Sequence, residues 1–429
     1  MSMPNYPNYK DSGAKWVGRI PAHWVVSPLK HMLDIQNGAD HKNVESTEGF
    51  PVIGSGGPFT FATEFLYDGE AVLLGRKGTI DKPLHVNGKF WTVDTMYWSK
   101  ILPGTWGRFA YYVALAIPFD YYSTNTALPS MTKSVLGAHL VARPPIDEQT
   151  AIATFLDRET AKIDALITEQ EKLIALLAEK RQATISHAVT KGLNPNAPMK
   201  DSGVAWLGEV PAHWDVMPLK YLVELRSGGT PSKDNLDYWG GDVPWASAKD
   251  LKLEKLIGTI DCITQQAIDE GAASLIRAGA VLVVVRGMIL ARMFPVVEAL
   301  VPMAINQDLK AVLPRKGLDG SFLAWLLRGS ANESLQRLDE AGHGTKALRM
   351  DAWTSMQLPI PPLEEQIQMV EFISRETAKI DGLRLASQRA IELLGERRSA
   401  LVAAAVTGQI DVRAAMSQTV AECPEAIAA

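Results

Sequence analysis

The residues that could do chemistry in this chain are scattered, and their spacing matches no catalytic or metal-binding pattern. The two cysteines, Cys262 and Cys423, cannot form a disulfide framework or a four-cysteine metal site, and no Cys/His pair has zinc spacing. His23 and His213 each stand in the sequence PAHW, which favours a packed turn histidine over a ligand. Four isolated carboxylates could serve as acids or bases, but no motif links them: Asp81, Asp94, Asp250 and Asp308.

Two glycine-rich stretches, Ile53–Gly57 (IGSGG) and Gly75–Thr79 (GRKGT), could in principle bind phosphate. Neither fits GxxxxGK followed by Ser or Thr, and neither has dinucleotide-binding spacing, so a turn between strands is favoured. Arg76 and Lys77 can still present cations to a phosphate. The chain also lacks the Asn/Asp-Pro-Pro-aromatic tetrapeptide of amino-methyltransferases and a glycine signature for AdoMet. We therefore predict no catalytic residue, metal or cofactor in this chain.

Length and composition indicate a folded protein of several domains. A chain of 429 residues predicts about two to four domains, and 47% apolar with 21% charged residues argues against disorder. No apolar run reaches the roughly eighteen residues of a membrane span, and the first residues, MSMPNYPNYKDSG, lack the apolar core of a signal peptide. These features predict a cytoplasmic protein.

The charge balance argues against nucleic-acid binding. The net charge is −5, from 43 basic and 48 acidic residues, whereas a basic footprint is usual for such proteins. Residues 25–143 carry 10 basic and 10 acidic side chains, and residues 215–360 carry 16 and 17. The segments 144–193 and 361–411 each carry 6 basic and 8 acidic side chains.

The chain contains an internal duplication. An opening motif occurs at Lys10–Lys30 (KDSGAKWVGRIPAHWVVSPLK) and again at Lys200–Lys220 (KDSGVAWLGEVPAHWDVMPLK), with 14 of 21 positions identical. A second block occurs at Pro144–Lys191 and Pro361–Gly408, with 22 of 48 positions identical, and includes RETAKID twice. The variable blocks that separate these two motifs in each repeat show little sequence similarity to each other. Either the inserts of an old duplication have drifted, or the common frame positions two inserts that recognise different things.

The second block has the pattern of a long helix that begins after a double proline and ends at Gly192 or Gly408. Apolar residues recur at heptad spacing, although Glu159, Gln170 and Lys180 interrupt them. The predicted helix-pairing residues are Ile152, Leu156, Ile163, Leu166, Leu173 and Leu177 in the first copy and Phe372, Ile373, Ile380, Leu383, Ile391 and Leu394 in the second. We expect the two helices to pair antiparallel. The alternative is that each packs on its own domain.

The predicted fold class is α+β: two mixed α/β domains separated by two long helices that pair as an antiparallel coiled coil, in a pseudo-twofold tandem duplication. Strand-like runs include FPVIGSGG, AVLLGRKGTI and AVLVVVRGMIL, and SFLAWLLRG predicts a short helix with Ser321 at its N-cap. The expected domains are the opening motif at 1–24, a variable domain at 25–143, a helical region at 144–193, the repeated opening motif at 194–214, a second variable domain at 215–360, a helical region at 361–411 and a disordered tail at 412–429.

The repeated motifs resemble those of the specificity (S) subunit, or HsdS, of type I restriction–modification systems. The likeness rests on DSGxxWxGxxPxHWxxxxLK and on PPxxEQ before RETAKID, each present twice. The second variable block adds GGTPS at Gly228–Ser232, YWGGDVPW at Tyr238–Trp245 and INQDL at Ile305–Leu309. The resemblance covers nearly everything from Lys10 to Ile410.

The resemblance implies a non-catalytic subunit whose two variable domains are target recognition domains, each reading one half of a bipartite, asymmetric site in double-stranded DNA. The helices would set the spacer between the half-sites and dock two methyltransferase (M) subunits. AdoMet, ATP and Mg would belong to the M and restriction (R) subunits, and none to this chain. Two alternatives stay open: a protein-interaction scaffold or orphan S-like subunit that reads no DNA, which the acidic balance favours, and a nuclease with an unrecognised site.

Base reading needs side chains that can reach groove edges, such as Arg, Lys, Asn, Gln, Ser and Thr. Beside glycines, Ser and Thr are also common turn residues. The apolar sequence GMILARMF after Arg286 departs from the polar loop expected there. The candidate DNA-binding residues are Ser55, Arg76, Lys77, Thr79 and Lys133 in the first variable domain and Thr230, Ser232, Lys233, Ser247, Lys249, Arg286, Asn306, Gln307 and Lys346 in the second.

Overall fold

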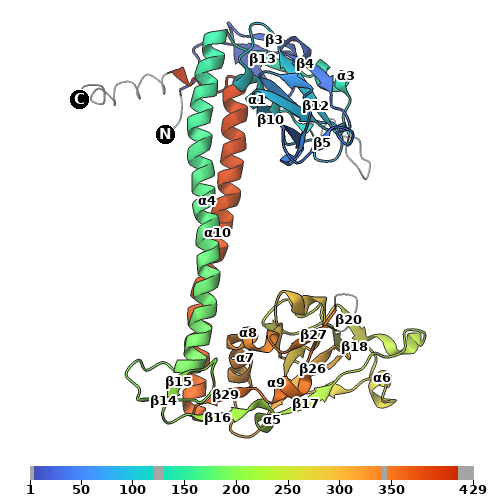
Figure 1. The fold of residues 1–429 in the computed structure, drawn as a ribbon, viewed down its shortest axis with the longest axis vertical. Coiled ribbons are helices and arrows are strands. Elements are labelled where there is room, and N and C mark those ends of the chain that lie inside the picture. The colour runs from blue at the N-terminus through green and yellow to red at the C-terminus, as the bar shows by residue number, and fades with distance from the viewer. Residues whose placement is uncertain (1–3, 120–129, 341–344, 414–429) are drawn as a thin grey trace. The chain divides into compact units, whose positions relative to one another are not determined.

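The computed structural model describes residues 4–119, 130–340 and 345–413, and the chain divides into two compact units. Unit 1 consists of Met1–Glu171 together with Gln388–Ala429, and unit 2 of Lys172–Ser387 (Figure 1). Each unit is therefore built from both copies of the repeat. The predicted disordered tail lies outside the described residues from 414 onward. At its start the prediction is wrong, because Val412 is fully buried in unit 1.

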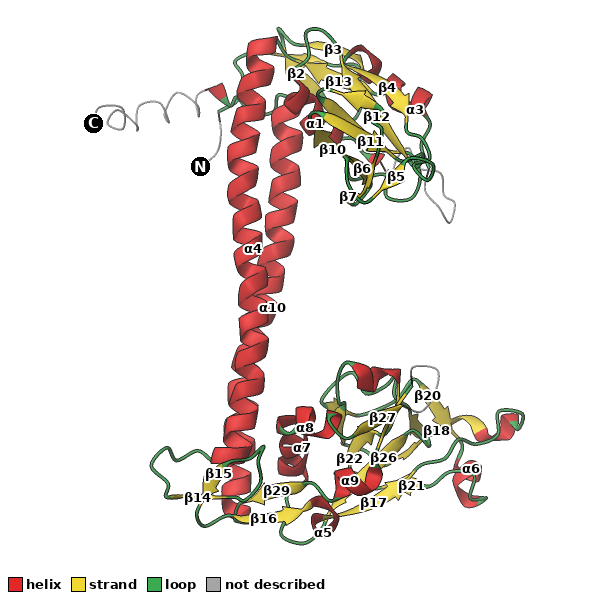
Figure 2. Cartoon of the chain, in the orientation of Figure 1, coloured by secondary structure: helices red, strands yellow, loops and turns green. Residues whose placement is uncertain are grey.

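The two predicted long helices are confirmed as α4 (Ile146–Lys191) and α10 (Leu363–Val406), shown in Figure 2. Each begins directly after a proline pair and carries two acidic residues in its first turn, where the positive end of the helix dipole favours them. The predicted stops are also confirmed. Gly192 (φ +80°) and Gly408 (φ +72°) adopt the left-handed conformation in which glycine ends a helix at least cost.

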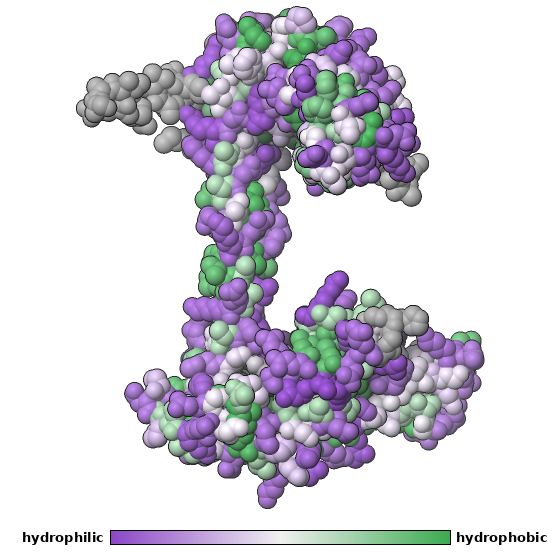
Figure 3. Space-filling view, in the orientation of Figure 1, coloured by the Kyte–Doolittle hydropathy of each residue, from purple (hydrophilic) through white to green (hydrophobic). Residues whose placement is uncertain are grey.

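The predicted seam is wrong at three leucines. Leu166, Leu173 and Leu383 are 52%, 40% and 57% exposed. Figure 3 shows apolar patches on the surface of the long helices. The buried side of the helices includes polar residues, among them Thr160 and Thr377, each of which donates a hydrogen bond to the carbonyl four residues earlier. The remaining predicted seam residues are buried or half-buried: Ile152, Leu156, Ile163, Leu177, Phe372, Ile373, Ile380, Ile391 and Leu394.

Within each unit, an ion pair joins α4 to α10. In unit 1, Nε of Arg398 lies 2.8 Å from Oδ1 of Asp164. In unit 2, Nε of Arg181 lies 3.2 Å from Oδ1 of Asp381. The four residues occupy equivalent positions of the two repeat copies, so the same contact is made in both units.

Unit 1 contains two main sheets, whose strands follow the glycine-punctuated runs of the first variable block. One sheet has the order β10 (Leu84–Val86), β9 (Ala71–Gly75), β12 (Met96–Ile101) and β4 (Leu33–Asn37). The other has the order β5 (Glu45–Ser46), β7 (Gly57–Ala62), β6 (Phe50–Gly54), β11 (Lys89–Thr92) and β8 (Tyr67–Asp68). Shorter elements complete it: β1 (Tyr9–Asp11) with β2 (Arg19–Pro21), β3 (Val25–Pro28) with β13 (Leu140–Arg143), the 3₁₀ turn η1 (Leu29–His31), α1 (Gly107–Leu115) and α3 (Lys133–Ala138).

Unit 2 has a similar plan, with a five-stranded sheet in the order β17 (Val223–Ser227), β26 (Leu309–Pro314), β22 (Val281–Val284), β24 (Val296–Ala299) and β19 (Lys255–Leu256). A four-stranded sheet has the order β20 (Asp261–Ile263), β18 (Trp239–Ala246), β25 (Met303–Ile305) and β21 (Leu275–Ile276), and a three-stranded sheet has β23 (Arg286–Gly287), β28 (Lys346–Leu348) and β27 (Leu338–Glu340). The remaining elements are β14 (Met199–Asp201) with β15 (Glu209–Pro211), β16 (Asp215–Pro218) with β29 (Gln357–Ile360), η2 (Leu236–Tyr238), η3 (Met288–Ala291), α5 (Leu219–Leu222), α6 (Gln265–Asp269), α7 (Gly320–Gly329), α8 (Ala331–Leu335) and α9 (Met350–Thr354).

The predicted short helix of the second block is confirmed as α7, but its predicted cap is wrong. Asp319, rather than Ser321, is the N-cap, and its side chain accepts a hydrogen bond from the backbone N–H of Phe322. Asp satisfies an otherwise unpaired donor of the first turn as well as Ser does.

Glu148, in the first turn of α4, binds the opening motif of unit 1. Its Oε1 lies 2.6 Å from Nε2 of His23, and its Oε2 accepts a hydrogen bond from Nε1 of Trp24 at 3.0 Å. Trp24 is fully buried, so the carboxylate satisfies an indole donor that has no access to water.

Glu365 of α10 forms the same pair of contacts in unit 2, with His213 at 2.6 Å and Trp214 at 3.0 Å. His23 and His213 are therefore not simply packed turn residues. Each is about half exposed and bound to a carboxylate at the start of a long helix.

The glutamine that follows each of these glutamates anchors the variable domain. Nε2 of buried Gln149 donates to the carbonyls of Gly104 and Pro144, and its Oε1 accepts from the backbone N–H of Trp106 at the start of α1. Gln366 forms the three equivalent bonds before α7, at 2.8 to 3.0 Å. The repeated PPxxEQ sequence thus joins three parts of each unit: the long helix, the opening motif and the variable domain.

Candidate nucleic-acid interface

Three strands of unit 2 end at one place, where their following loops meet. The backbone N–H of Gly229, after β17, donates to the carbonyl of Ile305 at the end of β25 (2.9 Å). The N–H of Asn306 donates to the carbonyl of Ala246 at the end of β18 (2.9 Å), and Nε1 of Trp245 donates to the carbonyl of Gly229 (3.0 Å). We call the residues just beyond these ends, Gly228–Thr230, Ser247 and Asn306–Gln307, the strand-end cluster of unit 2.

Glycine is required where β17 enters this cluster. A Cβ at Gly228 would lie 2.0 Å from the carbonyl oxygen of Ile305, which no side chain can accommodate. Unit 1 has the same feature at the end of β4, where a Cβ at Gly38 would lie 2.0 Å from the carbonyl oxygen of Val93. The backbone of Ala39 then donates to Thr92 after the same turn. The two variable domains therefore build their strand ends in the same way.

The structure brings together four of the predicted DNA-binding residues in the cluster of unit 2, but they are not equally available. Thr230 and Gln307 are exposed and hydrogen-bonded to each other. Ser247 is half-buried, and its hydroxyl and N–H both donate to Asp250. Asn306 is 8% exposed, and its Oδ1 accepts from a backbone N–H two residues on, which is a turn-stabilising role.

A cation occupies the same place in both units. The N–H groups of Arg76 and Lys77, after β9, donate to the carbonyl of Thr95. In unit 2 the N–H groups of Val285 and Arg286, after β22, donate to the carbonyl of Asp308. Lys77 and Arg286 are thus equivalent, and both are exposed. Despite the apolar sequence after it, Arg286 lies on a strand that pairs with β28.

The other candidates of unit 1 lie on turns and at a helix start. Ser55 is half-buried in the turn between β6 and β7, and Thr79 is exposed after β9. The guanidinium of Arg76 donates to the carbonyl of Asp94 and lies 5.8 Å from the ring centroid of Tyr97. Lys133 is the exposed first residue of α3.

The remaining candidates of unit 2 are exposed, or bound to carboxylates. Ser232 and Lys233 are exposed beyond β17. Nζ of Lys249 lies 2.6 Å from Oδ2 of Asp261, and this hydrogen bond raises the pKa of Lys249. Nζ of Lys346 lies 2.6 Å from Oε1 of Glu340 and lowers the pKa of that carboxyl. A phosphate would have to compete with these partners.

Two kinds of residue were missed by the sequence reasoning. Exposed apolar side chains lie near the candidates, including Phe59 of β7, and Ile257 and Ile260 in the loop between β19 and β20, which line a hollow together with Lys249. A choice of candidates by hydrogen-bonding type could not find them. The second kind is the Glu-Gln pair at the start of each long helix, for which the signal was available because the pair is identical in both repeats.

No group of three or more His, Cys, Asp or Glu side chains that could hold a metal ion occurs among the described residues. Within the same residues, no helix is both long enough and apolar enough to cross a membrane.

The fold is that of the specificity subunits of type I restriction–modification systems. One solved structure, titled "Structural basis underlying complex assembly and conformational transition of the type I R-M system", matches 90% of this chain and 98% of its own, with 17% identity and a TM-score of 0.65. The HsdS subunit from Thermoanaerobacter tengcongensis matches 91% of this chain and 98% of its own, with 15% identity and a TM-score of 0.51.

Sequence comparison finds similarity to the same kind of protein. The model of the type I restriction modification DNA specificity domain matches residues 211–392. The EcoR124I/EcoR124II specificity subunit of Escherichia coli is 29% identical over 39% of this chain, and the MjaIX specificity subunit of Methanocaldococcus jannaschii is 28% identical over 39%. The matches span about two fifths of these relatives' lengths, 41% and 39%. Residues 211–392 thus match the DNA specificity domain of type I systems, and the relatives and solved structures agree with the resemblance of the repeated motifs to HsdS subunits.

Proposed function

We propose that this chain is the DNA sequence-specificity subunit of a type I restriction–modification complex and does no catalysis itself. Each variable domain reads one half of a bipartite, asymmetric target in double-stranded DNA. The observation that carries this proposal is the equivalence of Lys77 and Arg286, an exposed cation at the same position of each unit, each held by the backbone beside a glycine-dependent turn. A phosphate or base edge placed there meets a positive charge on a hydrogen-bonded segment of backbone.

The two long helices, in this proposal, form an antiparallel coiled coil with pseudo-twofold symmetry and set the spacer between the half-sites. Support comes from the equivalent ion pairs, Arg398 with Asp164 and Arg181 with Asp381. The identical bonding of Glu148 and Glu365 to their opening motifs also supports a common duplicated frame.

The partners we propose are two methyltransferase subunits and the restriction subunits, which bring AdoMet, ATP and Mg. Such a complex would also supply part of the phosphate neutralisation that a chain with a net charge of −5 does not provide. The relatives named above are specificity subunits, which supports a non-catalytic role.

A second function, that of a scaffold without DNA reading, is favoured by the acidic balance and by the carboxylates that hold Lys249 and Lys346. Co-expression with a type I methyltransferase subunit, followed by mapping of methylated adenines across the host genome, separates the two. The specificity role predicts a single bipartite motif that disappears when this gene is removed. An intact complex that methylates no defined motif would show that the chain is a scaffold.

A further inference from the structure

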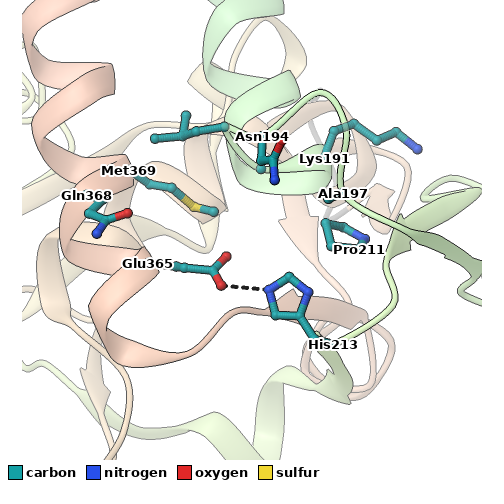
Figure 4. A pocket seen from close by; sticks show the side chains of 10 residues that line it. Lys191, Asn194, Ala197, Pro211, His213, Glu365, Gln368 and Met369 are labelled. Carbon is teal, nitrogen blue, oxygen red and sulfur yellow. Dashed lines mark hydrogen bonds and ion pairs between the residues drawn. The ribbon is translucent and has the colours of Figure 1, made fainter.

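A cavity of about 250 Å³ opens in unit 2 between the opening motif, the end of α4 and the start of α10 (Figure 4). Its wall includes His213, Glu365, Met369, Pro211 and Ala197. The carboxylate of Glu365 points toward the imidazole of His213, at 2.6 Å. The volume is several times the roughly 30 Å³ that one water occupies in the liquid.

The same place in unit 1 is filled by a tyrosine of the chain itself. Tyr6 is 3% exposed, its hydroxyl donates to Oε2 of Glu148 at 3.0 Å, and its ring packs edge-on against Trp24 at 5.6 Å between centroids. The guanidinium of Arg413 lies 4.8 Å from the centroid of the Tyr6 ring and 3.7 Å from Glu148. Burial and the neighbouring carboxylate raise the pKa of Tyr6, so its hydroxyl stays protonated and donates.

Unit 2 repeats the tryptophan and the carboxylate that surround this tyrosine, but it has no tyrosine at the corresponding place. Glu365 repeats Glu148, and Trp214 repeats Trp24, with the same bond lengths to the carboxylate. Residues 193–198, which precede the repeated opening motif, read LNPNAP and contain no aromatic residue. Among the described residues, those that line the cavity include no tyrosine, phenylalanine or tryptophan.

We propose that the cavity of unit 2 is a docking site for a tyrosine side chain presented by a protein partner. The hydroxyl donates to Glu365 as that of Tyr6 does to Glu148, and the ring lies against Pro211 and Met369 of the cavity wall. A second copy of this chain is a poor source, because its Tyr6 is already buried in its own unit 1. Leu193 of the cavity wall and Ile367, next in sequence to Gln368 of that wall, are exposed and give a protein partner apolar surface to cover around the tyrosine.

The probes that test this proposal are N-acetyl-tyrosinamide, N-acetyl-phenylalaninamide and p-cresol, added to the ¹⁵N-labelled full chain. The indole N–H signal of Trp214 reports on the site, because it donates to Glu365. We expect the tyrosine amide to shift this signal with an affinity about tenfold higher than that of the phenylalanine amide, the factor for one hydrogen bond to a charged group. Equal affinities, or no shift with any probe up to its solubility limit, would overturn the proposal.

Two variants localise the effect. Ala197→Tyr fills the cavity from its own wall and should abolish the shift, with the thermal unfolding temperature of unit 2 as the check on its fold. Tyr6→Ala should open a second site, seen as a new response of the Trp24 indole. A shift of the Trp214 signal that survives in folded Ala197→Tyr would contradict the assignment. Tighter binding of p-cresol than of the capped tyrosine would instead indicate a free aromatic ligand and overturn the docking role.

Discussion

The guanidinium of Arg398 binds the carboxylate of Asp164 at 2.8 Å, joining α10 to α4 inside unit 1. Arg398 is 28% exposed and Asp164 51%, so the pair is only partly shielded from water and salt. The contribution of such a pair to stability is small, about 0.5–1 kcal/mol. The main effect of the pair is to favour the observed alignment of α10 with α4.

We predict that reversing either charge of this pair destabilises unit 1 and that reversing both restores most of the loss. Asp164→Arg or Arg398→Asp places like charges together, whereas the double variant recreates the attraction. A double-mutant cycle in urea unfolding should give a coupling energy of about 0.5–1 kcal/mol. Arg397→Asp, at an exposed neighbouring position, serves as the control and should show no coupling with Asp164→Arg. Strictly additive effects at Arg398 and Asp164 would show that the contact is not formed in solution.

Gly228→Ala should disturb the strand-end cluster of unit 2, because the new methyl group would lie 2.0 Å from the carbonyl oxygen of Ile305. We predict a loss of about 1–3 kcal/mol in the free energy of unfolding of unit 2, the usual cost of overpacking. Recognition of one half-site should be lost in the methylation map. Gly229→Ala is a matched control, because the nearest neighbour of the new methyl group, the carbonyl oxygen of Ala272, would be 3.4 Å away. Equal effects of the two substitutions would remove the steric explanation.

Lys77→Ala and Arg286→Ala should each weaken DNA binding by the assembled complex. If each cation contacts one phosphate, the slope of log affinity against log salt falls by about one unit per substitution. Fluorescence anisotropy with a target duplex at several salt concentrations measures this slope. Lys316→Ala is the control, since Lys316 is exposed beyond the far end of β26 and should leave the slope unchanged. An unchanged slope for both Lys77→Ala and Arg286→Ala would exclude these residues from the interface.

Unit 1 should lose stability between pH 6.5 and pH 4 through His139. Burial lowers the pKa of His139 from 6.5 to about 4, and its ring is stacked on Trp16 at 4.3 Å. In this interval the unfolded chain binds a proton that the folded chain does not, so stability falls as the pH falls, by at most about 1.4 kcal/mol per pH unit. Urea unfolding of the wild type and of His139→Gln at pH 7 and pH 5 measures the difference. A pH dependence that is the same in both proteins would assign the acid sensitivity to other groups.

The sequence predicts the parts of this fold that depend on local pattern or on repetition. The long helices follow from heptad spacing, and their ends from a proline pair and from Gly192 and Gly408. The exposed Leu166 and Leu383 show the limit of such reasoning, because an apolar side chain at heptad spacing can lie on either side of a helix that is apolar over a wide arc.

The candidate site could be predicted only as a set of side chains. Asn306 has the right chemistry for reading bases, yet it is committed to a turn, and only the three-dimensional structure shows this. The equivalence of Lys77 and Arg286 was also beyond the sequence, because it arises from backbone hydrogen bonds between strands distant in the chain.

Unit 1 is built from both ends of the chain, and this determines the order in which the two units can fold during synthesis. Val402, Ala405 and Val406 belong to the same buried core as Trp24 and Phe109. Unit 2 uses only residues 172–387, so its folding does not require the C-terminal residues of the chain. Most of unit 1 is translated first, but its core is incomplete until the C-terminal part of α10 has been synthesised. A chain truncated after residue 387 would therefore contain all of unit 2 but lack the part of α10 that completes the core of unit 1.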